Sequence, residues 1–110
     1  MTWAEVKKTH KTVAGINSSN GRVYSLLVNV DPKAPYPNQI SKNEIVYYFG
    51  QSTQFWAVQA LLNSVGKNQP IHVFQKLAIN KWQDLGNWLP VRIADEDEDG
   101  FWAIYLEPAK

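Results

Sequence analysis

Residues 45–64, with the sequence IVYYFGQSTQFWAVQALLNS, constrain the fold most because they change from a strand pattern to a helix pattern within one short segment. Residues 43–49 are rich in β-branched and aromatic side chains, which favours a strand. Successive side chains of a strand point to opposite faces, so Tyr47 and Phe49 share one face and Tyr48 lies on the other. Tyr47 and Phe49 are expected in the core.

A helix is expected to follow the polar joint at residues 50–54. Thr53 has the side chain of a helix N-cap, and Gly66 is placed to end the helix. The apolar side chains that recur at helical spacing, and are expected to face the core, are Phe55, Val58, Leu61 and Leu62. Trp56 lies beside this stripe and is expected to be partly exposed.

The rest of the chain alternates short strand patterns with turn signals. The predicted segments are a short capped helix at residues 2–9, a turn at 17–21, a proline-rich loop at 31–41, and strands at 22–30, 70–78, 81–94 and 101–107. Gly86 and Pro90 interrupt the strand at 81–94, which indicates a bulge or a bend. These patterns predict the α+β class: a small, mostly β, partly open barrel with one main helix and a short N-terminal helix.

The length and composition set further limits. The chain has 110 residues, which predicts one binding domain over residues 1–110, either alone or as part of a longer protein. It contains no cysteine, which excludes disulfides and thiolate metal sites. Apolar runs stay well below the roughly 18 residues of a membrane span. We therefore expect a soluble, cytoplasmic protein.

The charges are unevenly distributed along the chain. The net charge is only +1, but basic residues dominate the first 42 positions and acidic residues gather at 95–99. Such a distribution allows one end of the molecule to face an anion. The alternative is a scattered basic surface and a solvated acidic loop.

The sequence lacks the signatures of an enzyme. His10 and His72 are far apart in sequence, and no metal-ligand spacing, phosphate-binding loop or nucleophile motif is present. The acidic run at 95–99 lacks the spacing of a calcium-binding loop and is interpreted as a solvated turn. His72 follows a strand pattern and is expected to be structural. We expect no catalytic residue, no metal and no cofactor.

The joint at residues 50–54 offers chemistry suited to recognition. Aromatic side chains flank it, and a base stacked on an aromatic ring gains about 1–3 kcal/mol. A protein that reads one base of a duplex must flip that base out, stack it and bond to its polar edge. The joint supplies polar side chains and the free amides of a helix N-terminus. The alternative is that the rings only pack the two sides of a barrel.

The segment from Ile45 to Ile93 adds a resemblance. Its succession IVYYFGQ…AVQALLNSVGKNQPIHVFQK…W…LGNWLPVRI resembles the SRA-like and PUA-like readers of modified DNA bases that accompany HNH and related nucleases in modification-dependent restriction systems. The resemblance covers about half of the chain. It implies a PUA/SRA-like barrel that binds double-stranded DNA, flips a modified base, expected to be a cytosine derivative, and serves a fused or separate nuclease without catalysing a reaction itself.

On this interpretation the site residues fall into two groups. The expected base pocket consists of Tyr36, Tyr48, Gln51, Ser52, Thr53 and Trp56. The residues expected to hold phosphates are Lys7, Lys8, Lys11 and Arg22, with Lys67 and Lys76 extending the track.

Two other functions remain open. The first is an RNA-binding module of the EVE or PUA-like kind, which would use the same barrel and aromatic rings on single-stranded RNA. The second is a non-catalytic protein-interaction domain in which the aromatic side chains are all core.

Overall fold

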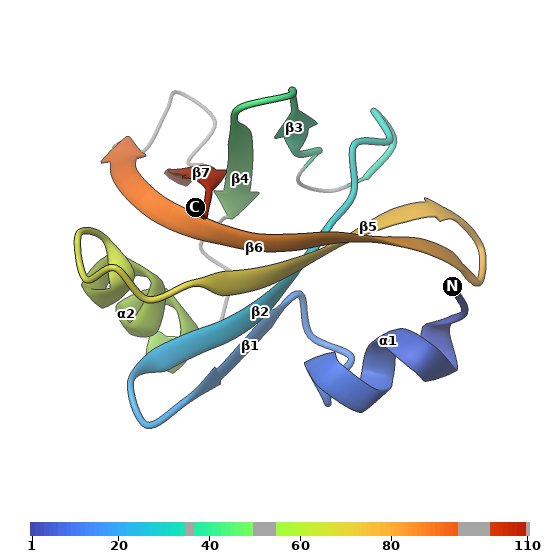
Figure 1. Cartoon of the computed structure of the whole chain (residues 1–110), viewed down its shortest axis with the longest axis horizontal. Coiled ribbons are helices and arrows are strands. Elements are labelled where there is room, and N and C mark those ends of the chain that lie inside the picture. The colour runs from blue at the N-terminus through green and yellow to red at the C-terminus, as the bar shows by residue number, and fades with distance from the viewer. Residues whose placement is uncertain (35–36, 50–54, 95–101, 110) are drawn as a thin grey trace.

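One continuous sheet flanked by two helices makes up the fold (Figure 1). The computed structural model describes residues 1–34, 37–49, 55–94 and 102–109. In these residues the elements are α1 (Trp3–His10), β1 (Ile16–Ser19), β2 (Arg22–Val28), β3 (Gln39–Ile40), β4 (Ile45–Phe49), α2 (Phe55–Ser64), β5 (Ile71–Ala78), β6 (Lys81–Ala94) and β7 (Trp102–Pro108).

The sheet has the strand order β1-β2-β5-β6-β7-β4-β3. Neighbouring strands are antiparallel except for β2 and β5, which run parallel. The long strand β6 joins two halves, because its first half pairs with β5 and its second half pairs with β7. Figure 1 shows β6 curving across the molecule. The predicted α+β class, with a mostly β, partly open barrel, is confirmed.

Two irregularities in β6 allow this curvature. Gly86 has φ 76°, in the left-handed region that favours glycine, and the register with β5 shifts beside it. The register with β7 shifts again between Pro90 and Arg92. The predicted bulge or bend at Gly86 and Pro90 is confirmed, and β6 remains one continuous strand through both.

The main core lies between the sheet and α2. It includes Ile45, Tyr47 and Phe49 of β4, and Leu61 is its most buried contribution from α2 at 0% exposure. The helix face differs in part from the predicted stripe. Phe55 of the predicted stripe lies outside the side chains that the structure describes. Among the others of α2, Ala57, Ala60, Leu61 and Ser64 are buried, whereas Val58 and Leu62 are only partly buried. The small side chains of Ala57, Ala60 and Ser64 let the helix approach the sheet closely.

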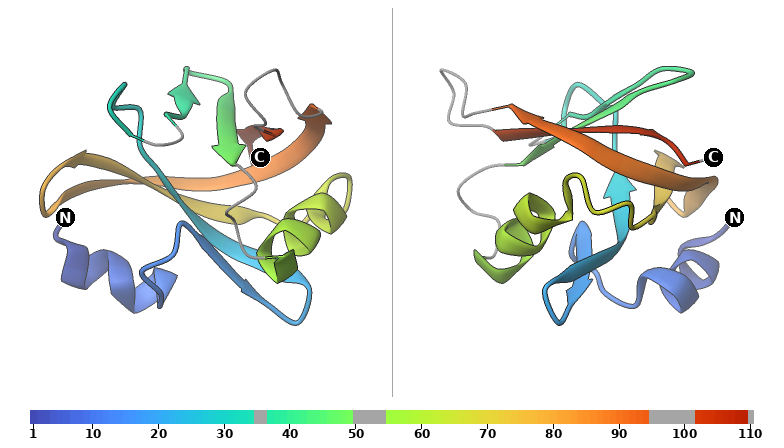
Figure 2. Two further views of the ribbon diagram at one scale, coloured as in Figure 1. Left: turned by 180° about the vertical axis from the view of Figure 1, so that it is seen from behind. Right: turned by 60° about the vertical axis from the view of Figure 1, so that its left-hand side comes forward.

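The short helix α1 lies on the other side of the β1–β2 ribbon from α2 (Figure 2). Its start has the predicted capping box: the Glu5 amide donates to the Thr2 hydroxyl at 3.3 Å, and the Thr2 amide donates to the Glu5 carboxylate at 2.9 Å. The start of α1 is also anchored to the β5–β6 hairpin, because the rings of Trp3 and Trp82 lie 5.3 Å apart.

Two strands were not predicted. Residues 17–21 were interpreted as a turn, but β1 extends to Ser19 and only Asn20 and Gly21 form the hairpin turn, with φ 53° and 76°. The short strand β3 lies within the proline-rich segment, where it pairs with β4.

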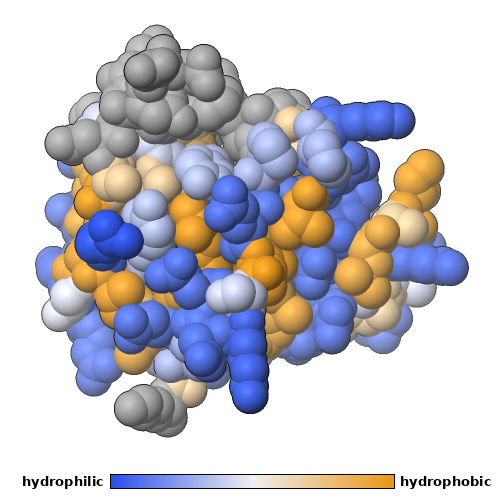
Figure 3. Space-filling model, turned by 90° about the horizontal axis from the view of Figure 1, so that it is seen from above, coloured by the Kyte–Doolittle hydropathy of each residue, from blue (hydrophilic) through white to orange (hydrophobic). Residues whose placement is uncertain are grey.

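The surface mixes residue types on the face seen from above, where hydrophobic and hydrophilic residues are interleaved (Figure 3). Individual large apolar side chains are well exposed, among them Ile79 at 89% and Trp56 at 78%. Within the described ranges, no helix is long and apolar enough to span a membrane.

Candidate nucleic-acid interface

The aromatic side chains of β4 lie on two faces, with Tyr47 and Phe49 in the core and Tyr48 on the other face. Tyr47 is 7% exposed and Phe49 2%, and their rings stack with centroids 6.3 Å apart. Both belong to the main core, so their predicted burial is confirmed. Burial raises the pKa of the Tyr47 hydroxyl well above its usual range, because the charged form would lose its hydration. Tyr48 points to the opposite face and is half-buried.

Tyr48 shares its face of the sheet with Ala103 and Tyr105 of β7. Across the β4–β7 ladder Tyr48 faces Ala103, and Tyr105 is two residues further along the same face of β7. The Arg92 guanidinium carbon lies 3.9 Å from the centroid of the Tyr105 ring. This face therefore combines two phenol rings and a cation with the buried side chains of Val46 and Ala103, which are 7% and 4% exposed.

The bulge in β6 brings Arg92 to this face. Pro90 pairs with the core residue Leu106, but after the register shift Arg92 pairs with Tyr105. Val91 is the extra residue of this bulge and has no partner on β7. Arg92 is therefore opposite Tyr105 and lies on the same face of the sheet. The sequence reasoning missed Arg92 and Tyr105. Gly86 and Pro90 signalled a bulge, but not its effect on the face to which Arg92 points.

Most of the predicted base pocket lies outside the described residues. This applies to Tyr36, Gln51, Ser52 and Thr53. Of the predicted pocket the structure places only Tyr48 and Trp56.

Trp56 lies on the α2 side of the sheet. It contributes to a hollow of about 490 Å³ together with polar residues of the β1–β2 hairpin and of α2, including Ser19, Asn20 and Asn63. Because α2 packs on the face that Tyr47 and Phe49 share, Trp56 and Tyr48 are on opposite sides of β4. In the described part of the chain, the two rings do not face each other across one pocket.

The predicted phosphate ligands occupy several places. Lys7 and Lys8 are exposed on α1, Lys11 follows α1 as its C-cap, and Arg22 begins β2. Lys67 is exposed just after α2. The structure brings Lys11 and Arg22 together and places Lys67 and Lys76 elsewhere.

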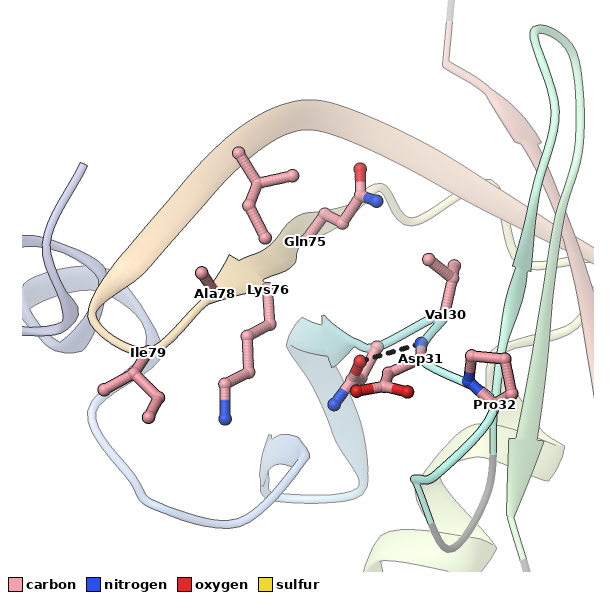
Figure 4. A pocket seen from close by; sticks show the side chains of 9 residues that line it. Val30, Asp31, Pro32, Gln75, Lys76, Ala78 and Ile79 are labelled. Carbon is pink, nitrogen blue, oxygen red and sulfur yellow. Dashed lines mark hydrogen bonds between the residues drawn. The ribbon is translucent and has the colours of Figure 1, made fainter.

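Lys76 lines a separate hollow of about 540 Å³ between the end of β2 and the end of β5 (Figure 4). That hollow also contains Asp31, whose amide is held by the Asn29 side chain at 3.0 Å. Lys76 therefore shares its surroundings with a carboxylate, which lowers the attraction of this hollow for an anion.

Lys11 and Arg22 share a hollow of about 850 Å³, called the polar hollow below. It opens between the end of α1 and the strands β1, β2, β5 and β6. The lining residues that matter here are Lys11, Asn17, Arg22, Tyr24, His72 and Asn87. The described lining residues include no Asp or Glu. The Arg22 guanidinium carbon lies 4.8 Å from the centroid of the Tyr24 ring.

A buried hydrogen-bond network lies beside the polar hollow. The His10 and Ser25 side chains are 0% exposed, and His10 Nδ1 is 2.7 Å from the Ser25 hydroxyl. His10 Nε2 is 2.6 Å from the Ala14 carbonyl, which can only accept, so Nε2 carries the proton. Burial lowers the pKa of His10, and the bond to Ala14 offsets this only in part. The neutral ring then accepts from Ser25 at Nδ1, and Ser25 accepts from Asn17 at 3.1 Å.

His72 has partners on two sides. Its Nε2 lies 2.6 Å from the Asp84 carboxylate, and its ring stacks on Phe74 with centroids 4.5 Å apart. These contacts fix the ring, and its remaining surface lines the polar hollow. Among the residues that the structure describes, no three His, Asp or Glu side chains are grouped to hold a metal ion. The acidic run at 95–99 lies outside those residues.

Solved structures share this fold over nearly the whole chain. The SUVH5 SRA domain in complex with hemimethylated CG DNA matches with TM-score 0.79 and 15% identity, over 97% of this chain and 82% of that chain. SUVH5 SRA bound to fully hydroxymethylated CG DNA matches with TM-score 0.72 and 16% identity, over 97% and 83%. The modification-dependent TagI restriction endonuclease matches with TM-score 0.73 and 16% identity, over 98% of this chain and 48% of that chain.

The present chain thus spans about half the length of TagI and most of the SUVH5 domain. No protein-family model and no curated protein sequence matches it. At these identities the similarity establishes the fold, and the chain has an SRA-like fold.

Proposed function

We propose that this SRA-like chain binds double-stranded DNA and senses a modified base, expected to be a cytosine derivative, as the specificity module of a restriction or defence nuclease. The observation that supports this most is its full-length likeness to SRA domains whose structures contain methylated and hydroxymethylated DNA. The likeness to a modification-dependent restriction endonuclease supports the link to a nuclease, fused or separate.

In this proposal the modified base is flipped out of the duplex and stacks on Tyr48. The ring is half-buried and lies on the face of β4 that points away from the main core, opposite Ala103 of β7. Tyr105 and Arg92 flank the same face and can contact the base or the adjacent backbone. Tyr36, Gln51, Ser52 and Thr53 complete the pocket, with Gln51 reading the polar edge of the base.

The described geometry favours Tyr48 over Trp56 as the stacking ring. Trp56 is 78% exposed but lies on the α2 side of the sheet, beside the β1–β2 hairpin. We therefore assign Trp56 to a contact outside the base pocket. Replacement of Tyr48 should then affect discrimination between modified and plain DNA more than replacement of Trp56.

Phosphate contacts position the duplex without reading its sequence. Lys7, Lys8, Lys11 and Arg22 are the proposed ligands on the α1 side, and Lys67 and Lys76 are proposed to reach other parts of the backbone. Each phosphate that they neutralise should contribute about −0.9 to the slope of log affinity against log salt concentration. The chain itself is proposed to bind DNA without cutting it, and its nuclease partner to supply catalysis.

The experiment that tests this function is a comparison of affinities for matched duplexes. Duplexes with unmodified, methylated and hydroxymethylated cytosine at one position are titrated at fixed salt, with a single-stranded RNA of the same sequence as a control. We expect tighter binding to at least one modified duplex than to the plain duplex and the RNA. Preferential binding to the RNA would support the RNA-binding module instead, and no binding to any nucleic acid would support a protein-interaction domain.

A further inference from the structure

Arg22 has an unused hydrogen-bond donor at the polar hollow. Its Nε atom is buried and has no acceptor among the described residues. A buried donor of a charged group that lacks a partner is costly, and such groups in native proteins usually have one. The guanidinium carbon lies 4.8 Å from the centroid of the Tyr24 ring, and an arginine stacked on a ring can still donate from its N–H groups in the plane. Because Nε is buried, an acceptor that enters the polar hollow reaches this donor when the Arg22 side chain rotates toward it.

The charge around Arg22 favours an anionic acceptor. Lys11 lines the same hollow, and the described lining residues carry no carboxylate. The carboxylate that touches a lining residue, Asp84, already accepts from His72 at 2.6 Å and from the Gly86 amide at 2.8 Å. The excess of positive charge is local, because the whole chain has a net charge of only +1.

The polar hollow is also held in shape before any ligand arrives. Ser25 joins His10 and Asn17, which fixes the end of α1 against β1 and β2. Lys11 has φ 65°, and its amide donates to the Lys7 carbonyl at 2.8 Å, which fixes the backbone from which its side chain extends. A site that is ordered in advance loses less conformational entropy when it binds a ligand.

We propose that the polar hollow is a binding site for the phosphate group of a nucleotide. A guanidinium matches two phosphate oxygens with two parallel N–H bonds, and Lys11 adds a point charge. Asn87 adds a neutral polar group, and the Tyr24 ring forms part of the wall. The volume of about 850 Å³ exceeds what a phosphate alone needs and falls within the range of pockets for small organic ligands.

This site is separate from the proposed base pocket. Arg22 is on β2 and Tyr48 is on β4, and the strands β5, β6 and β7 lie between them in the sheet. The proposal extends the phosphate contacts proposed above for Lys11 and Arg22, and it does not depend on the reading of a modified base. The phosphate could come from a DNA backbone or from a free nucleotide, and both sources offer the same chemistry to Arg22 and Lys11.

The first experiment uses inorganic phosphate and deoxycytidine 5′-monophosphate as probes. The Nε–H signal of Arg22 is followed by ¹⁵N NMR during each titration. We expect a saturable shift, with the nucleotide binding more tightly than inorganic phosphate. Arg22→Gln and Lys11→Gln should each weaken nucleotide binding about tenfold, as the loss of a charge-assisted hydrogen bond does. The matched control Lys42→Gln, an exposed lysine that does not line the polar hollow, should change it less than about twofold.

Several results would overturn the proposal. They are a shift that does not saturate, an equal effect of Lys42→Gln, or unchanged affinity in a folded Lys11→Gln protein. Melting curves establish that each variant is folded, and Lys11→Gln provides the test if Arg22→Gln does not fold. Tyr48→Ala should leave the shift of Arg22 Nε–H with inorganic phosphate unchanged, because this probe has no base, so failure of the base-reading proposal is distinguishable from failure of this one.

A competition experiment distinguishes the two sources of phosphate. If the polar hollow holds the DNA backbone, deoxycytidine monophosphate should displace plain and modified duplexes alike, and Lys11→Gln should weaken both by the same factor. If it holds a free nucleotide, duplex binding should be unaffected by the nucleotide and by Lys11→Gln. Either result supports a phosphate site. Displacement of DNA by the nucleotide that persists in full in Arg22→Gln and Lys11→Gln would place phosphate binding elsewhere.

Discussion

A helix lies on each side of the β1–β2 ribbon, and different chemistry holds the two helices. On the α2 side the buried side chains are mostly apolar, and Leu61 of α2 belongs to the main core together with Val23 and Leu26 of β2. On the α1 side fully buried polar groups meet, with His10 bonded to Ser25. Apolar packing supplies most of the stability of a fold. The polar network contributes less free energy but fixes where α1 ends, and hence where Lys11 stands next to Arg22.

The comparison teaches that burial alone does not separate structural from functional side chains. Tyr47 and Tyr48 are neighbours in sequence, and alternation along β4 sends one into the core and the other to the opposite face. His10 is as buried as any core residue, yet it borders a surface that we propose to bind a ligand. We therefore expect the binding sites at the polar hollow and at the face of β4 that contains Tyr48, rather than in the core beneath α2.

The largest effect should come from truncation of the α2-side core. Phe49→Ala removes a ring that is 2% exposed and should lower the free energy of unfolding by about 3–5 kcal/mol. Tyr48→Ala, on the other face of the same strand, should cost much less because its ring is only half-buried. Urea unfolding of the two variants measures the difference. Equal losses would show that the two faces of β4 are not distinct in packing.

An intermediate effect is expected where the loop after α1 meets the core. A methyl group on Gly15 would lie 2.9 Å from the Tyr47 hydroxyl, closer than van der Waals contact allows. Gly15→Ala should therefore lower the free energy of unfolding by about 1–3 kcal/mol. Tyr47→Phe removes the hydroxyl, so the double variant should lose less than the sum of the two single variants. Strict additivity in this double-mutant cycle would contradict the close contact.

The smallest effect should appear on acidification and should involve the α1-side network. The pKa of His10 is lowered in the folded state by burial, so the folded protein binds fewer protons there than the unfolded chain, whose His pKa is about 6.5. The contribution of neutral His10 to the free energy of unfolding is fully present above pH 6.5. This contribution is lost as the pH falls below 6.5 and through the lowered pKa of the folded state.

Unfolding free energies of wild type and His10→Gln between pH 4 and pH 8 test this directly. Glutamine cannot titrate, so the wild type should show an additional loss of stability at low pH that the variant lacks. His72 is present in both proteins and cancels in the comparison. If the unfolding free energies of the two proteins change in parallel with pH, the pKa of His10 is not lowered in the folded state.

The sequence predicted the elements that depend on patterns of neighbouring residues. The capping box of α1, the strand β4 with its two faces, the bulged β6 and the partly open barrel were all predicted. Strand β1 was missed because Asn17, Ser18 and Ser19 are polar and their strand geometry depends on pairing with β2. The α2 stripe was predicted from large apolar residues, whereas Ala57 and Ala60 are buried because close packing against the sheet selects small ones.

The site was less predictable, because its parts come together only through long-range pairing. Tyr105 and Arg92 become neighbours through the β6–β7 register and the bulge at Val91. The contacts of Ser25 with His10 and Asn17 depend on how α1 folds back on the sheet. Local patterns do not encode which strands pair, so the sequence could not show that Trp56 lies in a hollow with the β1–β2 hairpin while Tyr48 faces Ala103 of β7.

The most direct test of the account is the discrimination between a methylated and a plain duplex by Tyr48→Ala, with Trp56→Ala as the matched aromatic control. Removal of a ring that stacks on the flipped base should weaken binding to the preferred modified duplex by about 1–3 kcal/mol and change plain-duplex binding far less. Trp56→Ala should leave the ratio of the two affinities close to that of the wild type. If Trp56→Ala abolishes the discrimination while a folded Tyr48→Ala protein keeps it, the base is not read on the face of β4 that Tyr48 shares with Tyr105 and Arg92.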